Sequence, residues 1–580
     1  MTRAPLRIVL AATVAAAALA GPPGFAAPTA ETPPDGFAAA YLAGHIAEQR
    51  GETDVAADRL QTALELAPET PALRRRVVRL QVAEGAFADA AVGAEALAAE
   101  GDDNFPVGLV RLAARMQAKD FAGVIELTDD AREAGLSTVV ALLGKAWATA
   151  GMGDVDAGAK LLTDAAKDMQ GLKVLLTMHA GLMAEMAERH DLAHWMYDEA
   201  LTAATADDRP PSPRLIQVIA GYYDRQGMAD AAAEARAKGP AGGEDPDDTA
   251  AVGSIAPNAA AGLGEALYNF AGSLYGDRQY AQALIYARIT AALRPNDPAT
   301  LFTVAQSLEA SGRPAAAATV YQATPKVGSY AWRAPMRAAE ALSDADKTDA
   351  AIDAMRAVMN SAPERAEPAI ALGHMLRGAQ RFPEAVEAYD EAVRRKGGEL
   401  GPDDGWLRYA RGVALERSGR WDEAETEFLT ALETLGDEPL VLNYLGYTWI
   451  DRGEHLERAR GMVARAVELR PDDGFIRDSL GWAEYRAGDY VAAAATLERA
   501  VALQPLDPVI NEHLGDAYWR VGRVREARFQ WRRALSFEPE AKDIPKIEEK
   551  LKCGVDGCPA AAAPPAVTDG ATAPGKPDGG

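Results

Sequence analysis

The chain has 580 residues, of which 48% are apolar and 25% charged, a composition typical of a folded protein with several domains. Aromatic residues make up only 7%, and much of the apolar share is alanine, which favours closely packed helices over a β-sandwich. With 60 basic and 85 acidic residues the net charge is −25, which argues against nucleic acid and anionic lipid as partners.

The N-terminus has the layout of a secretory signal peptide. Arg3 and Arg7 precede an apolar run over 8–20, which is followed by small residues and prolines. This run is shorter than the roughly 20 residues that span a membrane, so we expect cleavage after Ala20 or Ala26 rather than a permanent anchor. No cysteine follows the run to accept a lipid. The pattern predicts a periplasmic mature protein without a membrane span.

Most of the remaining chain carries a pattern that recurs every 34 residues, and the pattern is clearest near the C-terminus. In a typical unit small residues stand at positions 8, 20 and 27, glycine at position 15, a large side chain at position 24 and proline at position 32. Several of these markers are lost in 71–172, so the N-terminal array is degenerate. In two consecutive units these markers are Gly481, Gly488, Ala493, Leu497, Ala500 and Pro505, and then Gly515, Gly522, Ala527, Trp531, Ala534 and Pro539.

This pattern resembles the tetratricopeptide repeat, a helix–turn–helix unit of 34 residues. The resemblance implies an all-α superhelical solenoid, with about fourteen units in two arrays, six in 37–238 and eight in 264–541. Between the arrays we expect a linker rich in Gly, Pro and acidic residues. The expected division is signal peptide 1–26, N-terminal array 37–238, linker 239–263, C-terminal array 264–541, capping helix and cysteine loop 542–558, and disordered tail 559–580.

Each marker has a physical role in such a unit. The small residues allow the two helices to approach closely, where a larger side chain would overpack. Glycine ends the first helix in a left-handed conformation, and proline stops the second helix. The large residue at position 24, for example Tyr321, Tyr389, Phe428 or Trp531, fills the space between units.

No catalytic motif is recognisable. The nearest is His190-Asp-Leu-Ala-His194, but a zinc protease would need glutamate directly after the first histidine, and Asp191 stands there. We therefore predict no enzyme, no cofactor and no metal site, while an enzyme with a dispersed site stays as an alternative. Cys553 and Cys558 are separated by a short glycine-containing loop, and in an exported protein we predict that they form a structural disulfide.

The surface predicted to bind partners is the inner face of the last repeats. In this repeat family the first helix of each unit lines a concave groove, with positions 2, 5, 9, 12 and 13 facing inward. Those positions hold large aromatic side chains beside charged ones, as protein-binding hot spots do. They are Trp406, Tyr409, Arg417, Asn443, Tyr447, Asp451, Phe475, Asp478, Trp482, Tyr485, Arg486, Glu512, Asp516, Trp519 and Arg520. An alternative for the two tryptophans at 482 and 519 is packing between adjacent first helices.

The run 443–547 resembles a narrower bacterial envelope family, through NYLGY, DSLGW and HLGDAYWRVGR. That family includes lipoprotein adaptors that bind a carboxyl-terminal processing protease and bring it cell-wall hydrolases. The resemblance implies protein partners of those kinds, although this sequence lacks the cysteine that accepts the lipid. A second interpretation is an assembly factor for an outer-membrane or secretion complex.

Overall fold

The structure is a computed structural model that describes residues 36–102, 104–206, 210–240 and 253–557. Within these ranges the chain forms α-helices and two short 3₁₀ helices (Gln170–Leu172 and Pro402–Asp404), and no β-strand. The helices follow one another along the chain as helix–turn–helix repeats, six before residue 240 and eight after residue 258. The predicted all-α fold built from fourteen helix–turn–helix units is confirmed.

The first six pairs contain the helices α1 to α12. They are α1 (Phe37–Gln49) and α2 (Thr53–Leu66), α3 (Pro71–Glu84) and α4 (Phe87–Ala99), α5 (Val107–Gln117) and α6 (Phe121–Asp129), α7 (Thr138–Gly151) and α8 (Val155–Asp168), α9 (Lys173–Met186) and α10 (His190–Thr205), and α11 (Pro213–Arg225) and α12 (Ala229–Ala237).

The next sixteen described helices, in chain order, are α14 to α29, and one further helix follows them. They are α14 (Ala259–Gly276) and α15 (Tyr280–Leu293), α16 (Pro298–Ala310) and α17 (Pro314–Ala323), α18 (Tyr330–Asp344) and α19 (Thr348–Ser361), α20 (Glu367–Gly378) and α21 (Phe382–Arg395), α22 (Gly405–Arg417) and α23 (Trp421–Leu435), α24 (Pro439–Arg452) and α25 (Leu456–Leu469), α26 (Gly474–Arg486) and α27 (Tyr490–Leu503), α28 (Pro508–Arg520) and α29 (Val524–Ser536), and then α30 (Ile544–Cys553).

The marker residues explain how the helices of one unit pack. A Cβ atom on Gly515 would overlap the indole of Trp531, and one on Gly412 would overlap the ring of Phe428. Glycine at position 8 therefore makes room for the large side chain at position 24, which is fully buried in both units. At position 15, Gly522 has a φ of 82°, the left-handed conformation that ends the first helix.

The chain divides into two compact units, unit 1 (residues 1–381) and unit 2 (residues 382–580). The predicted linker 239–263 lies inside unit 1, and its last five residues belong to α14 instead. Asn258 begins this helix early, because its side chain accepts a hydrogen bond of 3.0 Å from the backbone N–H of Ala261.

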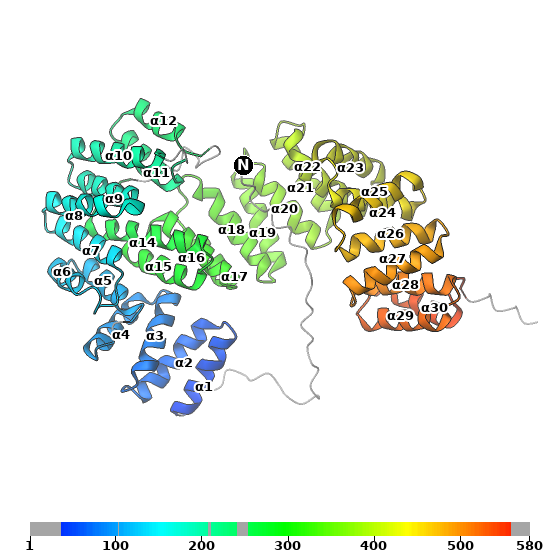
Figure 1. The fold of residues 1–580 in the computed structure, drawn as a ribbon, viewed down its shortest axis with the longest axis horizontal. Helices are drawn as coiled ribbons and strands as arrows, with labels where there is room; N and C mark the ends of the chain where they lie inside the picture. The colour runs from blue at the N-terminus through cyan, green and yellow to red at the C-terminus, as the bar shows by residue number, and fades with distance from the viewer. Residues whose placement is uncertain (1–35, 103, 207–209, 241–252, 558–580) are drawn as a thin grey trace, which may run out of the picture. The chain divides into compact units, whose positions relative to one another are not determined.

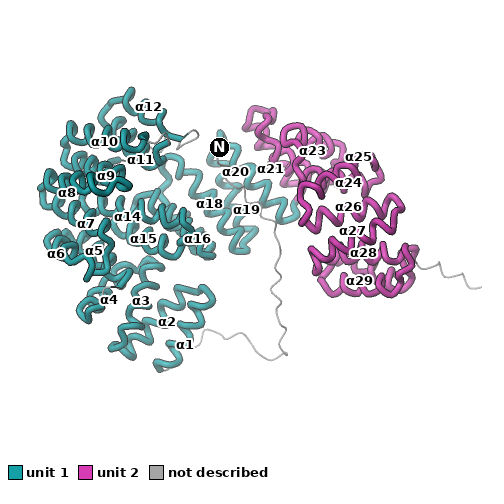
Figure 2. Tube along the Cα trace, viewed as in Figure 1, with its two compact units in different colours: residues 1–381 teal, residues 382–580 magenta. Residues whose placement is uncertain are grey.

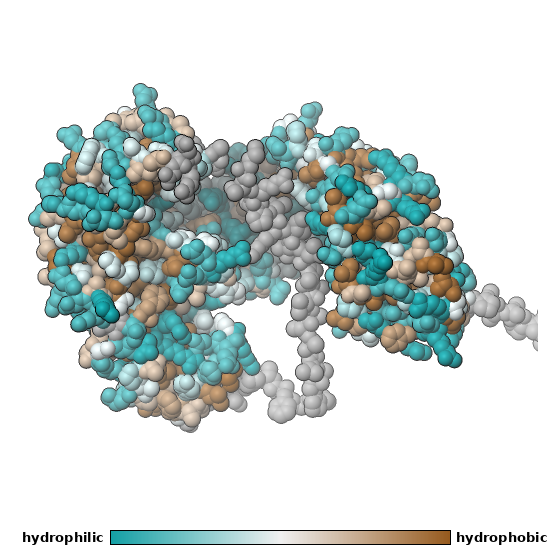
Figure 3. Space-filling model, viewed as in Figure 1, coloured by the Kyte–Doolittle hydropathy of each residue, from teal (hydrophilic) through white to brown (hydrophobic). Residues whose placement is uncertain are grey.

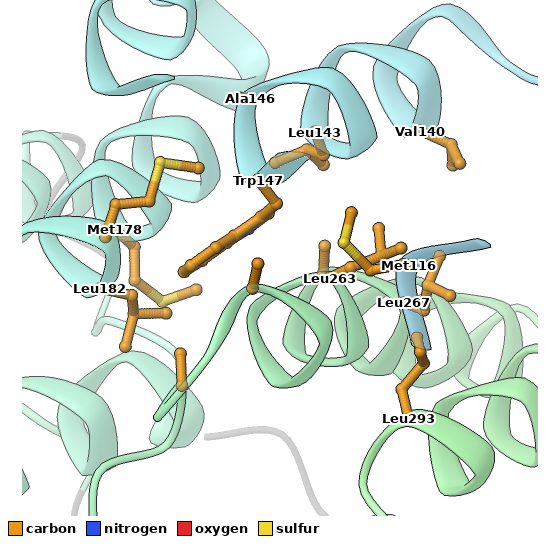
Figure 4. Packing of buried hydrophobic residues seen from close by; sticks show 14 of the residues in the cluster. Met116, Val140, Leu143, Ala146, Trp147, Met178, Leu182, Leu263, Leu267 and Leu293 are labelled. Atoms are coloured by element: carbon orange, nitrogen blue, oxygen red, sulfur yellow. The ribbon is translucent and has the colours of Figure 1, made fainter. Parts of the chain in front are cut away.

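In unit 1 the helices α14 and α15 pack onto the first helices of the N-terminal array. α14 contacts α5, α7 and α9, and α15 contacts α3 and α5. Figure 4 shows the resulting core, in which Leu263 and Leu267 of α14 lie among Met116, Trp147 and Leu182 of the array. The segment after the predicted linker thus fills the inner face of the array that precedes it.

None of the described helices is long and apolar enough to cross a membrane. On the face seen in Figure 3, hydrophobic surface on each unit is broken up by hydrophilic surface. The predicted signal peptide lies outside the described residues.

Candidate protein-binding surface

The first helices of the repeats in unit 2 lie next to one another. α24 contacts α26, and α26 contacts α28. α22 joins this row through Tyr409, whose ring centroid lies 5.9 Å from that of Tyr444 on α24. We call the side of these four helices that carries the predicted binding residues the first-helix face of unit 2.

Most of the predicted groove residues keep part of their side chain at the surface, whereas two do not. Arg417, Asp451, Phe475, Arg486 and Arg520 are exposed; Trp406, Tyr409, Asn443, Tyr447, Trp482, Tyr485, Glu512 and Trp519 are half-buried; Asp478 and Asp516 are buried. The first-helix face therefore presents aromatic rings and charged groups together. Two of the carboxylates that the sequence predicts on this face are buried.

The two buried carboxylates hold the repeats together. Asp478 is 6% exposed, and both of its carboxylate oxygens lie 3.0 Å from Nδ1 of His513 on the next first helix. Asp516 is 3% exposed and accepts hydrogen bonds from Trp531 Nε1 at 2.9 Å and from Lys550 Nζ at 2.6 Å. The repeat register predicts both in the groove, and the structure corrects this, because their partners cover them.

Trp482 packs between adjacent first helices. Its ring is nearly parallel to that of Tyr485, at 4.8 Å and 7°, and to that of His513, at 4.1 Å and 15°. Its indole Nε1 is buried and has no hydrogen-bond partner among the described residues. Trp482 thus packs between adjacent first helices, which is the alternative stated for it in the sequence analysis. Part of its side chain also stays exposed on the first-helix face.

The C-terminal helix α30 closes the far end of this face. A Cβ atom on Gly554, directly after α30, would overlap the ring of Trp519, so the loop lies against this tryptophan. Lys550 pairs with Glu512 at 2.6 Å, and Asp556 pairs with Arg520 at 2.9 Å. The last repeat is therefore covered where the row of first helices ends.

Exposed charged groups link the same helices at the surface. Arg486 lies 3.7 Å from Asp451 on the preceding first helix, and Arg520 Nε donates a hydrogen bond of 3.3 Å to the Tyr485 hydroxyl. Exposed pairs of this kind stabilise a protein by only about 0–1 kcal/mol, so a ligand can replace them at little cost.

The sequence did not single out His513 or Lys550. His513 stands 35 residues after Asp478, one repeat plus one residue, and this spacing is the signal that would have connected them. Burial on its own lowers the pKa of His513, but Asp478, helped by Asp516 and Glu512, outweighs burial and raises it. The charged imidazolium is thereby favoured at the junction of α26 and α28.

In the N-terminal array the corresponding face of α3, α5, α7 and α9 is not open, because α14 and α15 cover it. A buried ion-pair cluster strengthens this contact: Glu265 of α14 accepts hydrogen bonds from Arg214 Nε at 2.8 Å and from Arg294 Nη1 at 2.7 Å. Glu265 has no exposed surface. Burial alone raises its pKa, but the two arginines outweigh burial and hold the pKa at about 2.

The remaining candidates of the sequence analysis carry no assembled site in the described part of the chain. His194 on α10 lies 3.4 Å from Asp198, one turn further along. No group of three or more His, Cys, Asp or Glu side chains is arranged there to hold a metal ion. Cys553 ends α30, but Cys558 lies outside the described residues, so the disulfide stays a prediction.

Three overlapping or adjacent segments, 336–399, 370–439 and 450–508, match the family described as "Tetratricopeptide repeat". These segments of the chain therefore contain tetratricopeptide repeats. The TPR repeat-containing protein PA4667 of Pseudomonas aeruginosa is 36% identical to this chain over 87 residues, which is 15% of either protein.

Among solved structures, the chain is similar to the APC/C hetero-tetramer Cut9-Hcn1, with 15% identity and a TM-score of 0.37 over 90% of this chain and 97% of that one. It is also similar to yeast Tom70, with 13% identity and a TM-score of 0.34 over 89% of this chain and 95% of that one.

Proposed function

We propose that this protein is a non-enzymatic scaffold of the periplasm that binds other proteins through the first-helix face of unit 2. The observation that carries this proposal is the difference between two equivalent surfaces. The first helices α3, α5, α7 and α9 of the N-terminal array are covered by α14 and α15, whereas the first-helix face of unit 2 keeps rings and charges at the surface. Periplasmic location rests on the signal-peptide pattern of residues 1–26.

The chemistry of this face suits an extended or helical protein segment. Half-buried rings of Tyr447, Trp482 and Tyr485 stand beside the exposed guanidinium groups of Arg486 and Arg520. Such rings provide contact area at a low entropic cost, and arginine provides several donors in a planar group. The helices that hold these side chains pack directly on one another, so little ordering is needed on binding.

The resemblance over 443–547 supports a more specific role as an adaptor, which brings cell-wall hydrolases to a carboxyl-terminal processing protease. The second candidate is an assembly factor for an outer-membrane or secretion complex, which the same face would serve. Capture of partners from an envelope extract, followed by mass spectrometry, distinguishes the two roles. A processing protease together with a hydrolase supports the adaptor, and subunits of one envelope complex support the assembly factor.

The site is tested by replacing Trp482 with alanine and measuring the affinity for a captured partner. If Trp482 is a hot spot, we expect a loss of about 1–3 kcal/mol in binding free energy. The matched control is Trp195→Ala on α10 of unit 1, where the ring is 57% exposed and lies outside the face. Arg486→Glu, an exposed substitution, tests the same face without removing a packed ring, and unchanged affinity in both variants would contradict the assignment.

A further inference from the structure

We infer that the chain's own C-terminal tail, residues 559–580, occupies the first-helix face of unit 2 and competes there with the protein partner. This inference rests on the proposed function, because it assigns a regulator to the same face. Four features carry it: the place where the tail begins, its composition, the groups that the face offers, and the length of the tail.

The tail begins at the face itself. After α30 the chain lies against Trp519 at Gly554, and Asp556 pairs with Arg520 of α28 at 2.9 Å. The last described residue is Gly557. The described chain therefore ends next to α28, the last first helix of the row, beside the predicted binding residues Trp519 and Arg520.

The composition of the tail is that of a segment recognised by aromatic surfaces. It contains five prolines and no charged residue before Asp569. Prolines favour the polyproline II conformation, which has no internal hydrogen bonds and leaves its backbone carbonyl and N–H groups free. Proline-rich segments bind to surfaces lined by aromatic rings, because the prolines pack on the rings and the free backbone groups pair with side chains.

The first-helix face has the complementary groups. Tyr447, Trp482 and Tyr485 lie half-buried on neighbouring helices. The first ten residues of the tail, 559–568, carry no charge, so they leave the surface pair between Asp451 and Arg486 in place.

The tail is long enough to reach these groups. Its 22 residues span about 65 Å in the polyproline II conformation. Packed helices lie about 8–10 Å apart, so the row from α28 back to α24 requires only about 20 Å. A tethered segment is present at an effective concentration in the millimolar range, so even weak binding competes with a partner. We expect deletion of residues 559–580 to raise the affinity for the partner about 3- to 10-fold.

The direct test is photo-crosslinking in the full chain, with benzoylphenylalanine at position 567 in place of Val567. We expect crosslinks within one chain, mapped by mass spectrometry to α24, α26 and α28. Replacing Pro564 and Pro565 by glycine should reduce their yield at least about 3-fold through the loss of the preformed conformation. These two residues follow the last repeat in the sequence, so this variant changes no residue of the repeats. Trp482→Ala should reduce the yield as well, while Trp195→Ala should not.

Several results would overturn the inference. Crosslinks between two chains would assign the face to the tail of a second copy, and crosslinks elsewhere or none would remove the tail from it. Partner affinity, measured separately, distinguishes this failure from failure of the proposed function. If Arg486→Glu weakens partner binding while the tail does not crosslink to the face, the binding site stands and only the tail as its regulator is wrong.

Discussion

His179 in unit 1 is buried as a neutral side chain, and this makes unit 1 sensitive to acid. Its Nδ1 accepts a hydrogen bond of 3.2 Å from Trp147 Nε1. Burial lowers the pKa of His179 to about 4, with Arg294 lowering it further and Glu265 opposing the change. The ordinary pKa of histidine is about 6.5, so the stability that the buried neutral ring of His179 contributes is complete above pH 6.5. It is lost as the pH falls towards 4.

We expect the free energy of unfolding of unit 1 to fall by about 3 kcal/mol between pH 7 and pH 4 through this residue. Urea unfolding at several pH values, followed by hydrogen exchange of α7 and α9, measures the slope. His179→Phe should flatten it, although the variant is less stable at pH 7 because Trp147 loses its acceptor. An equal slope in the variant would show that other groups cause the acid sensitivity.

His513 in unit 2 has the opposite effect. Burial disfavours its charged form, but the carboxylate of Asp478 outweighs burial and raises the pKa of His513 above its usual value. The stability that His513 gains from its pairing with Asp478 is therefore complete below pH 6.5. It is lost as the pH rises through the raised pKa of His513. We expect the junction of α26 and α28 to be less protected from hydrogen exchange at pH 9 than at pH 6, after correction for intrinsic rates. Asp478→Asn should abolish the difference, and a difference that persists would contradict the pairing.

The turn inside each repeat shows which residue choices lower stability. At position 15 most units have glycine, such as Gly488 with a φ of 84°, but Arg278 occupies the same conformation with a φ of 62°. A left-handed conformation costs a residue with a Cβ about 1–2 kcal/mol. We expect Arg278→Gly to stabilise the protein by about 1 kcal/mol and Gly488→Ala to destabilise it by a similar amount, both in thermal unfolding. A Cβ atom at Gly488 would meet no other atom, so the stability lost in Gly488→Ala measures the cost of the backbone conformation alone.

At the scale of helices, the sequence predicted what depends on local spacing. Gly515 and Trp531 belong to one unit, so their fixed separation predicted both the helix pair and its packing. The contact of Gly262 with Trp147, by contrast, joins residues more than a hundred positions apart. Nothing in the 34-residue period specifies that α14 turns back onto α5, α7 and α9, so its packing there was not predicted.

The same limit applies to the candidate site. The register placed Asp478 and Asp516 on the inner side of their helices, but burial depends on the neighbouring element. His513 and Lys550 cover these carboxylates, and neither belongs to the positions by which the repeats are recognised. Position within a repeat predicts the direction of a side chain, whereas its accessibility requires the structure.

The ion-pair cluster around α14 yields a prediction about this helix. Glu265→Ala removes the shared partner of Arg214 and Arg294 and leaves the buried guanidinium of Arg214 without a carboxylate, while Arg294 keeps its pair with Asp297. The loss should destabilise unit 1 by about 3–5 kcal/mol. The control is Asp156→Ala, which breaks an exposed pair with Arg189 at 2.8 Å and should cost about 0–1 kcal/mol. Urea unfolding of both variants provides the comparison. Similar losses in the two would mean that the cluster contributes no more than a surface pair.

At the scale of the whole molecule, the two units differ in how their repeats are connected. In unit 2 each helix pair contacts mainly its neighbours along the chain, as in a linear solenoid. In unit 1 the helices α14 and α15 contact α3, α5, α7 and α9, so repeats far apart in sequence share one core. Stability in a linear array is a sum of local and nearest-neighbour contributions, which allows the array to open from its ends. A shared core links the stability of distant repeats instead.

Hydrogen exchange at increasing urea should therefore differ between the units. In unit 2 we expect stepwise opening, with α30 first, because it contacts the repeats on one side only. In unit 1 the peptides of α7, α9 and α14 should lose protection together, since exposing α14 also exposes the core around Trp147. Lys550→Ala, which removes the pairs with Glu512 and Asp516, should advance the opening of α30 and leave the unit 1 transition unchanged. Loss of protection in α14 well before α7 would show that the long-range contacts do not couple the array.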